Sequence, residues 1–287
     1  MLGERKNMKK LVVKYLNFIY ELFLKEFIEE NKIASKRKRL LLRICLLGIF
    51  LILLIGIFEQ VMKINENNND FVDAVDKYYQ GNYQNAKKSI EKSIIVNNNQ
   101  NIIIEHYIRG SINYKLNRYY DALKDLSIVS GSNQEYFLDV RKKFFFSSDK
   151  FFTMNKQPIF IETCLMKSQC KMKLKDYRGA LLDAKIGIDT IIKYQNVYDK
   201  NYINEKYISL KYVSGCGNFK INKFEQALFL FNEIIKSGKE HSFPNVYIYK
   251  GLIAQMKKDK DSACLFFSRA GELGEASAYG YINKWCK

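Results

Sequence analysis

The feature that most constrains the fold of this 287-residue chain is a short pattern that recurs five times between residues 66 and 287. Each copy has a polar turn, an aromatic residue, two further residues and an alanine, after which apolar residues recur with helical spacing. In the fifth copy Lys260 replaces the aromatic residue, and in every copy a small residue stands twelve positions before the alanine. The alanines are Ala86, Ala122, Ala180, Ala227 and Ala263, and the small residues are Ala74, Gly110, Ser168, Gly215 and Gly251.

This spacing predicts pairs of antiparallel helices. A small residue on the first helix of a pair lets the second helix approach closely, and we expect the alanine on the second helix to meet it. We expect the aromatic residue three positions before the alanine to fill the gap between consecutive pairs. One pair alone leaves an apolar face in water, so neighbouring pairs must stack. The sequence therefore predicts an all-α fold, a helical-hairpin solenoid.

The composition excludes two other classes of protein. With 47% hydrophobic and 14% aromatic residues, the chain has too much apolar mass for a wholly disordered or low-complexity protein. An all-β sandwich needs a turn signal about every 8–12 residues. Two prolines cannot supply that punctuation, and the fifteen glycines do not fall at that spacing.

The repeated pattern resembles the tetratricopeptide repeat (TPR) family over roughly residues 66–287, and the last copy also resembles the related Sel1-type repeat. The chain lacks the family's early tryptophan and closing proline, and its alanines are 36, 58, 47 and 36 residues apart, against about 34 in the family. The long gaps predict an insert near 131–157 and an extended helix or loop near 188–204. The resemblance thus implies about five TPR-like repeats over 70–287, closed by a C-terminal capping helix at 275–286.

The TPR resemblance also implies a superhelix whose concave face, built mostly from the first helices, holds a peptide or a partner helix. A tyrosine suits such a groove because its ring supplies contact area and its hydroxyl gives direction. The alternative is that most of these residues belong to the core between repeats. Carried over by position, the groove residues are Tyr78, Tyr107, Ser111, Tyr114, Gln169, Tyr212, Phe219 and Gln255, with Phe71, Val75, Leu165, Met172, Cys216, Ile248 and Leu252 beside them.

Residues 40–58 form an apolar stretch of 19 residues with one charge, Arg43, near its start. At about 1.5 Å per residue such a helix matches the thickness of a bilayer, which predicts a single transmembrane helix acting as an uncleaved signal anchor. Residues 1–39 carry eleven Lys and Arg, whereas the 20 residues after Phe58 carry two. Basic flanks stay cytoplasmic, so we expect a cytoplasmic basic arm at 1–39, a linker at 59–69 and a periplasmic repeat domain at the bacterial inner membrane.

Two further segments combine basic and apolar residues. Residues 10–29 predict an amphipathic helix that lies on the membrane surface or packs on a partner helix. The insert interleaves lysine and arginine with phenylalanines at 144–146 and 151–152. Such a mixture suits a bilayer surface, a single-stranded nucleic acid or a protein partner. Nucleic acid does not fit an exported domain, and we favour an extra helix whose phenylalanines fill the gap between repeats.

The sequence contains no motif for catalysis or for cofactor or metal binding. His106 and His241 stand alone, and no HExxH, P-loop, GxGxxG or G-x-S-x-G motif occurs. None of the six cysteines belongs to a CxxC pair. An exported domain permits a disulfide, and antiparallel packing of the last repeat helix and the capping helix would bring Cys264 and Cys286 together.

The sequence therefore favours a non-enzymatic, membrane-tethered interaction module, a scaffold or chaperone-like adaptor that binds a partner protein or peptide. Its formal net charge of +17 would steer an acidic partner. One alternative is a transmembrane signalling protein that couples an exported repeat domain to a cytoplasmic regulator. A third interpretation reverses the topology and places the repeats in the cytosol, on a eukaryotic organelle.

Overall fold

The computed structural model describes Gly56 and residues 70–96, 102–131, 159–196 and 199–286. The arm and the linker lie outside these residues, as do almost all of the apolar stretch and of the insert, so what the sequence predicts for them stays a prediction. Within the described residues, no helix combines the length and the apolar character needed to cross a bilayer. The contacts separate Met1–Asn69 from a compact unit, Asp70–Lys287, and the account below concerns that unit.

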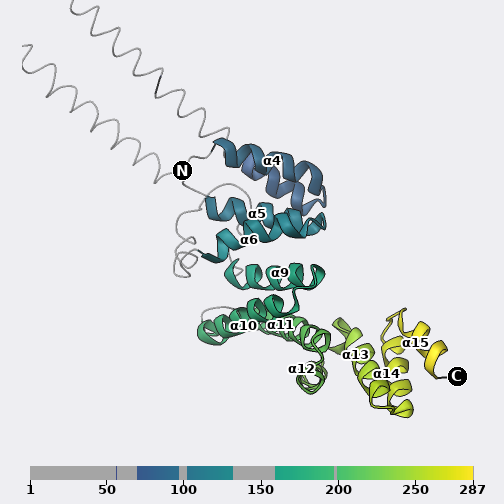
Figure 1. Cartoon of the computed structure of the whole chain (residues 1–287). Helices are drawn as coiled ribbons and strands as arrows, with labels where there is room; N and C mark the ends of the chain where they lie inside the picture. The colour runs from purple at the N-terminus through teal and green to yellow at the C-terminus, as the bar shows by residue number, and fades with distance from the viewer. Residues whose placement is uncertain (1–55, 57–69, 97–101, 132–158, 197–198, 287) are drawn as a thin grey trace, which may run out of the picture. The chain divides into compact units, whose positions relative to one another are not determined.

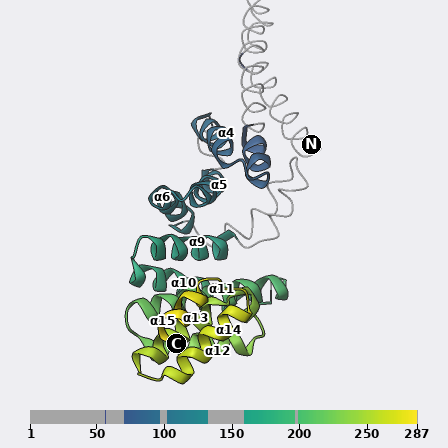
Figure 2. The same ribbon diagram turned by 90° about the vertical axis from the view of Figure 1, so that its right-hand side faces the viewer.

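The described part of this unit is all-helical, without a strand, as the sequence predicts. It forms five antiparallel helix pairs, of which the first joins a helix at 70–79 to α4 (Figure 1). Neighbouring pairs touch, because α6 lies against α9 and α10 against α11. Figure 2 shows α9 and α10 side by side. The helices are α4 (Tyr83–Val96), α5 (Ile102–Lys115), α6 (Tyr119–Gly131), α9 (Ile159–Lys173), α10 (Tyr177–Tyr194), α11 (Lys200–Lys220), α12 (Phe224–Lys236), the 3-10 helix η2 (Glu240–Ser242), α13 (Asn245–Met256), α14 (Lys260–Glu272) and α15 (Ala278–Trp285).

The long gap between the third and fourth repeat alanines is filled mostly by helix. α10 has 18 residues and α11 has 21, whereas α5 and α6 have 14 and 13. Asp199 starts α11, because its carboxylate accepts a hydrogen bond from the Tyr202 amide at 2.9 Å. The first turns of α11 therefore reach beyond the length that a repeat requires.

The turn inside each pair has the same backbone geometry. The residue five positions before the repeat alanine is left-handed, with φ of 78° at Gly81 and between 59° and 64° in the other four pairs. The next amide donates to the carbonyl five residues earlier, as Arg118 does to Asn113 at 2.9 Å, and this bond ends the first helix. Asparagine and glycine tolerate this conformation, whereas a lysine pays about 1–2 kcal/mol for it. The left-handed residues are Gly81, Asn117, Lys175, Asn222 and Lys258.

In the second, fourth and fifth pairs, the side chain nearest the glycine of the first helix is a larger one four positions after the alanine, whereas we expected the alanine itself. A Cβ added to Gly251 would lie 2.4 Å from Cε1 of Phe267, and one added to Gly110 would lie 2.9 Å from Cγ of Leu126. Helical side chains lean toward the N-terminus, so the longer side chain reaches back over the glycine. The alanines are still fully buried, with Ala122 at 0% exposure. In these three pairs the close approach of the two helices is therefore a contact between glycine and a large apolar side chain.

In the first, second and fourth pairs, the aromatic residue three positions before the alanine packs inside its own pair. Its ring lies against an aromatic residue near the end of the first helix, in a tilted or edge-on contact that closes the turn. We expected this ring to fill the gap between consecutive pairs, and the structure adds this contact within the pair. The ring centroids are 5.6 Å apart for Tyr78–Tyr83, 6.2 Å for Tyr114–Tyr119 and 5.7 Å for Phe219–Phe224.

Polar side chains also join the two helices in the first three pairs. In the second pair, Asp125 of α6 is 3% exposed and accepts hydrogen bonds from Arg109 of α5, whose Nη2 lies 2.6 Å away. His106 Nδ1 lies 2.8 Å from the same carboxylate, so this histidine has a structural contact. Burial alone would raise the pKa of Asp125, but the hydrogen bonds from His106 and Arg109 lower it overall. His241 is exposed in η2, away from such a network.

Candidate protein-interaction surface

Glu162, in the first turn of α9, is the centre of a polar and aromatic cluster. The Tyr202 hydroxyl donates a hydrogen bond to Glu162 Oε1, and Lys206 Nζ lies 3.0 Å from the same oxygen. Lys206 also lies 5.2 Å from the centroid of the Tyr202 ring, in a cation–π contact. Tyr202 and Lys206 both belong to the extension of α11, so that extension brings a phenol and an ammonium group to α9.

The charge of Glu162 also reaches three tyrosines of the first two helix pairs, and we group them with it. Burial raises the pKa of Tyr79, and the negative charge of Glu162 raises it further. The pKa of Tyr107 is raised for the same two reasons, and burial together with Tyr83, Tyr79 and Glu162 raises the pKa of Tyr78 to about 12. Their hydroxyls therefore stay protonated at neutral pH. We call Tyr78, Tyr79, Tyr107, Glu162, Tyr202 and Lys206 the Glu162 cluster.

The Glu162 cluster is only partly exposed to water. The side chains of Glu162 and Lys206 are 13% and 17% exposed, whereas Tyr79 is 46% exposed. Burial alone would lower the pKa of Lys206, but the charge of Glu162 raises it overall, so Lys206 stays charged at neutral pH. A polypeptide that approached Tyr79 would meet an open aromatic ring that packs edge-on against Tyr78 and lies within the field of Glu162, and aromatic rings are enriched at protein interfaces.

Metal chemistry finds no support in the part of the chain that the structure describes. No group of three or more His, Cys, Asp or Glu side chains there could hold a metal ion. Cys164, Cys170 and Cys216 are buried free thiols, and burial raises the pKa of Cys164 and of Cys170 to about 12. Buried thiols with such a pKa are poor nucleophiles. What the Glu162 cluster offers is hydrogen bonding and aromatic contact.

The groove residues that the TPR resemblance implies lie in several separate parts of the structure. Tyr78 and Tyr107 belong to the Glu162 cluster, and Gln255 lines a pocket in the last pair. Tyr107, Ser111 and Phe219 are buried, at 6%, 3% and 9% exposure, which favours the core alternative for these three. Ser111 donates to the Tyr107 carbonyl at 2.8 Å. The other five predicted residues are half-buried: Tyr78, Tyr114, Gln169, Tyr212 and Gln255.

Tyr212 and Phe219 belong to a second cluster, which joins the fourth and fifth pairs. The ring of Tyr249, from α13, lies 5.0 Å from that of Phe219 and stacks on Phe231 at 5.3 Å. Cys216 contacts the hydroxyls of Tyr212 and Tyr249, and burial raises the pKa of this thiol to about 11. These side chains are an internal contact between consecutive pairs, and they add little to an outer surface.

Sequence reasoning missed four members of the Glu162 cluster, namely Tyr79, Glu162, Tyr202 and Lys206. Tyr79 lies one residue after a predicted groove position, and Glu162 is a charge on an otherwise apolar helical stretch. Tyr202 lies within residues 188–204, and Lys206 lies just beyond them. The repeat pattern does not extend over this segment, so it cannot assign these two residues to a position in the fold. The sequence feature that could have identified this cluster is Glu162 itself, a single carboxylate among apolar residues. A buried charge needs a partner, so such a residue predicts a polar contact.

Cys264 of α14 and Cys286, which follows α15, are joined by a disulfide with an S–S distance of 2.06 Å. α15 packs on α14, where Tyr281 stacks on Phe267 with ring centroids 5.1 Å apart. The last helix is therefore attached by a covalent bond as well as by aromatic packing.

No model of a known protein family matches the chain, and no curated protein matches it in sequence. Among solved structures, the crystal structure of MamA is similar with a TM-score of 0.48 and 15% sequence identity, over 71% of this chain and 95% of MamA. A tetratricopeptide repeat protein from Parabacteroides merdae ATCC 43184 is similar with a TM-score of 0.31 and 14% identity, over 78% of this chain and all of that protein. The helix pairs, turns and contacts described above are what define the fold, an all-α array of TPR-like hairpins over the described residues.

Proposed function

We propose that this chain is a protein-interaction scaffold that holds a partner polypeptide at the Glu162 cluster. The observation that carries the proposal is a carboxylate that bonds side chains of α11 and whose charge also reaches tyrosines of the first two helix pairs. Glu162 pairs with Lys206 and Tyr202 from α11, and its charge acts on tyrosines of the first two pairs. A partner bound there would contact several repeats at once. The proposal assigns the chain no catalytic step.

Tyr79 and Tyr120 offer a matched test of this proposal. Both tyrosines are exposed, at 46% and 77%, but Tyr79 belongs to the Glu162 cluster and Tyr120 lies at the start of α6. A photoreactive benzoylphenylalanine would replace either tyrosine in the full chain, in cells that produce it. We expect a discrete crosslinked adduct from position 79 and none from position 120. Equal adducts at both positions, or none at position 79, would contradict the proposal.

A pair of substitutions measures the same interaction without a crosslinker. Tyr79→Ala removes the open ring of the cluster and should reduce the recovery of that partner several-fold. Tyr120→Ala removes a more exposed ring and should leave recovery unchanged. Because both side chains lie at the surface, neither substitution should reduce the helix content measured by circular dichroism.

The proposal includes a single-pass tether through residues 40–58, with the basic arm in the cytoplasm and the repeats in the periplasm of a bacterium. The basic flank of the apolar stretch supports this orientation. The disulfide between Cys264 and Cys286 supports it too, because disulfides persist in oxidising compartments. In this arrangement the chain acts as a scaffold or chaperone-like adaptor at the outer face of the inner membrane.

Protease protection tests the orientation. With the outer membrane opened, a protease added outside should degrade residues 70–287 and leave a fragment that contains the arm. Protection of the repeats in intact spheroplasts would instead support the reversed topology. A mature chain that begins after Phe58 would show that the apolar stretch is a cleaved signal and not a tether.

A further inference from the structure

The turns inside the helix pairs carry an excess of positive charge. Residues 70–287 hold 34 basic and 23 acidic residues, a net charge of +11. The turns of the second, third and fourth pairs (115–120, 173–178 and 220–225) hold seven basic and two acidic residues, so these 18 residues account for +5 of that charge. We call these three turns the basic edge. Its basic residues are Lys115, Arg118, Lys173, Lys175, Arg178, Lys220 and Lys223.

The charge of the basic edge is accessible to solvent. All seven basic residues are exposed, and none of them forms an ion pair within the part of the chain that the structure describes. The two acidic residues have other contacts. The Asp176 carboxylate accepts the Gly179 amide at 2.9 Å and so begins α10, and Glu225 lies 2.8 Å from Lys257 of the fifth pair. The positive charge is therefore not neutralised from within the three turns.

The three turns of the basic edge lie beside one another. Burial raises the pKa of Tyr114, near the end of α5, and the neighbouring Cys170 of α9 raises it further, so the ends of these two helices lie close together. A Cβ added to Gly217 of α11 would lie 3.0 Å from Cδ2 of Leu181, which follows the third turn. Figure 1 shows the turns of the second and third pairs at the same, right-hand ends of their helices. Charges from three helix pairs therefore gather along one edge.

The connections between consecutive pairs lie at the other ends of the helices and lack this charge. Their described residues are 195–196, 199 and 237–244. They hold one basic residue, Lys239, and two acidic residues, Asp199 and Glu240. The excess of positive charge therefore belongs to the turns inside the pairs and does not surround the repeats.

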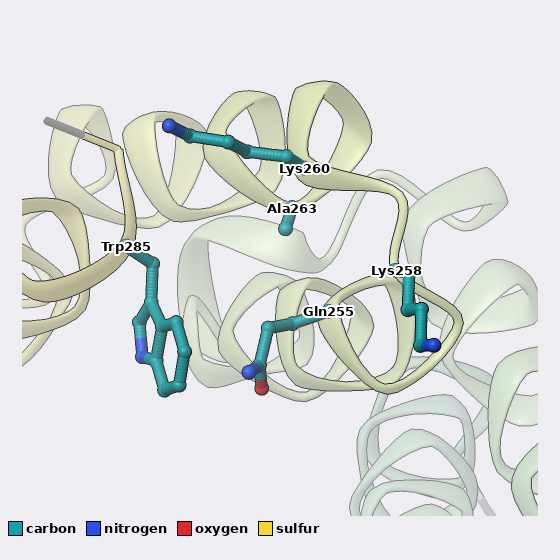
Figure 3. Close-up of a pocket in the computed structure, with 5 residues that line it drawn as sticks. All are labelled: Gln255, Lys258, Lys260, Ala263 and Trp285. Carbon is teal, nitrogen blue, oxygen red and sulfur yellow. The ribbon is translucent and has the colours of Figure 1, made fainter.

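The turn of the fifth pair contains lysines as well, but they do not form a patch. Lys257 is the lysine that pairs with Glu225. The ammonium groups of Lys258 and Lys260 lie at opposite ends of a surface pocket of about 170 Å³ (Figure 3). The charges of this turn are thus paired or separated, and the basic edge is confined to the second, third and fourth pairs.

The basic edge suits a flat anionic surface. A bound peptide needs a pocket in which its side chains are desolvated, whereas these basic residues are exposed at the ends of helices. Five of the seven are lysines, whose ammonium groups act as point charges and require no fixed geometry in a partner. Tyr120, close to Arg118, is 77% exposed, and tyrosine is enriched at membrane–water interfaces. The headgroups of an anionic bilayer present negative charge to all three turns at once.

We propose that the basic edge docks the repeats on an anionic bilayer surface. Each lysine close to such a surface increases the affinity about fivefold. The inference rests on the proposed tether through residues 40–58, which keeps a bilayer near the repeats, and it does not depend on the Glu162 cluster. Docking holds the repeats with these turns toward the headgroups. Tyr120 contacts lipid in this arrangement, which forms no adduct with a polypeptide.

Lipid crosslinking in vesicles tests the proposal. The full chain would carry benzoylphenylalanine in place of Gln226, exposed in the first turn of α12 beside the basic edge, or of His241, exposed in η2. Each variant would be reconstituted into vesicles of equal parts phosphatidylcholine and phosphatidylglycerol. Both leaflets have the same composition, so the direction of insertion does not affect the result. We expect several-fold more lipid adduct at position 226 than at position 241, measured by mass spectrometry.

Two controls show whether charge causes the contact. Vesicles of phosphatidylcholine alone, or salt at about 1 M, where the Debye length is about 3 Å, should reduce the adduct at position 226 to the level at position 241. Lys220→Gln combined with Lys223→Gln removes two charges of the basic edge and should reduce the adduct at position 226 several-fold. Lys236→Gln combined with Lys239→Gln removes two exposed lysines from the opposite end of the same pair and should leave the adduct unchanged.

Equal lipid adducts at positions 226 and 241 in the anionic vesicles, or an adduct at position 226 that salt does not reduce, would overturn the proposal. A polypeptide adduct at position 226 in cells, without a lipid adduct, would overturn it too and assign the basic edge to an acidic protein. Flotation of the vesicles in the same salt shows separately whether the chain is inserted. A chain that does not float contradicts the tether, whereas the salt-sensitive lipid adduct tests the basic edge alone.

Discussion

The first three helix pairs and the last two use the same turn but differ in the side chains thirteen positions before and three positions after the repeat alanine. In the first three pairs a polar contact crosses between the helices, from Ser89 to Asp73, from Arg109 to Asp125 and from Lys167 to Asp183. At the same positions the fifth pair has Lys250, whose Nζ lies 4.5 Å from the centroid of the Phe266 ring. The last two pairs place phenylalanines against glycines, Phe231 on Gly215 and Phe267 on Gly251, and the fourth pair has an ion pair elsewhere, between Lys211 and Glu233 at 3.5 Å. One backbone design therefore accepts either a charged or an aromatic link.

The largest expected effect concerns the aromatic link. Phe267 is fully buried, so Phe267→Ala leaves a cavity against Gly251 and should reduce the free energy of unfolding by about 3–5 kcal/mol. Leu265→Ala, two residues away and 67% exposed, is the control and should change it by less than about 0.5 kcal/mol. Urea unfolding followed by Trp285 fluorescence measures both. Equal effects would show that the glycine contact does not hold the last pair together.

The disulfide gives the next largest effect, and it also belongs to the last pair. Cys264 and Cys286 are separated by 22 residues, and a loop of about this length contributes roughly 3 kcal/mol when it is closed. Replacing both cysteines with serine should therefore lower the unfolding midpoint reported by Trp285. Dithiothreitol should lower the midpoint of the wild type to the same value and leave the serine variant unchanged. A wild type that does not respond to the reductant would argue against the disulfide.

A smaller effect tests the charged link of the second pair. Asp125→Asn weakens the contacts with Arg109 and His106 and should cost about 2 kcal/mol at neutral pH, the value of a hydrogen bond to a charged group. The folded state lowers the pKa of Asp125, so its stabilising contribution is complete above the unfolded pKa of about 3.9 and is lost as the pH falls through the folded pKa.

The pH dependence separates this link from the aromatic one. Between pH 7 and pH 3, the wild type should lose more stability than Asp125→Asn, because the variant has no carboxylate at this position to protonate. Phe267→Ala should keep the full acid sensitivity of the wild type. If Asp125→Asn loses as much stability as the wild type over this range, other carboxylates account for the acid sensitivity of these repeats.

The smallest expected effect concerns the turn inside each helix pair, which the two regions share. Lys175 holds φ at 64° in the turn of the third pair, where glycine needs no strain, so Lys175→Gly should raise the free energy of unfolding by about 1 kcal/mol. Lys173→Gly, in the last turn of α9, should lower it by about 1 kcal/mol because that residue is helical. Urea unfolding measures the change in the free energy of unfolding for each variant. The two changes have opposite signs if the turn is strained, and the same sign if it is not.

The helix pairs could be predicted from the sequence because they depend on local spacing. The alanine, the polar turn and the apolar periodicity mark each pair, and the structure shows a helix pair at each of the five alanines. The side chain nearest the glycine was not predicted, because the alanine is the recurring residue whereas the nearest side chain varies among Leu126, Phe231 and Phe267. A contact that changes its chemistry from copy to copy gives no repeating signal.

The Glu162 cluster could be predicted only in part. Tyr78 and Tyr107 follow from the register of the repeats, but Tyr202 and Lys206 come from the extension of α11, which has no counterpart in the other pairs. Their contact with Glu162 joins residues 40 and 44 positions apart, since 202 − 162 = 40 and 206 − 162 = 44. No periodicity within one repeat encodes such a distance, so the contact needs the folded chain.

The recurring turn has a consequence for how an array of this kind can change in length. Three backbone hydrogen bonds close it in each of the five pairs, and none of them involves a side chain. A duplicated hairpin would therefore keep its own bend as long as the residue at the left-handed position tolerates a positive φ. Only the fit between a small residue and its large neighbour would need to be adjusted afterwards. Gene duplication can thus lengthen the array one hairpin at a time, and point mutations then set the character of each new unit.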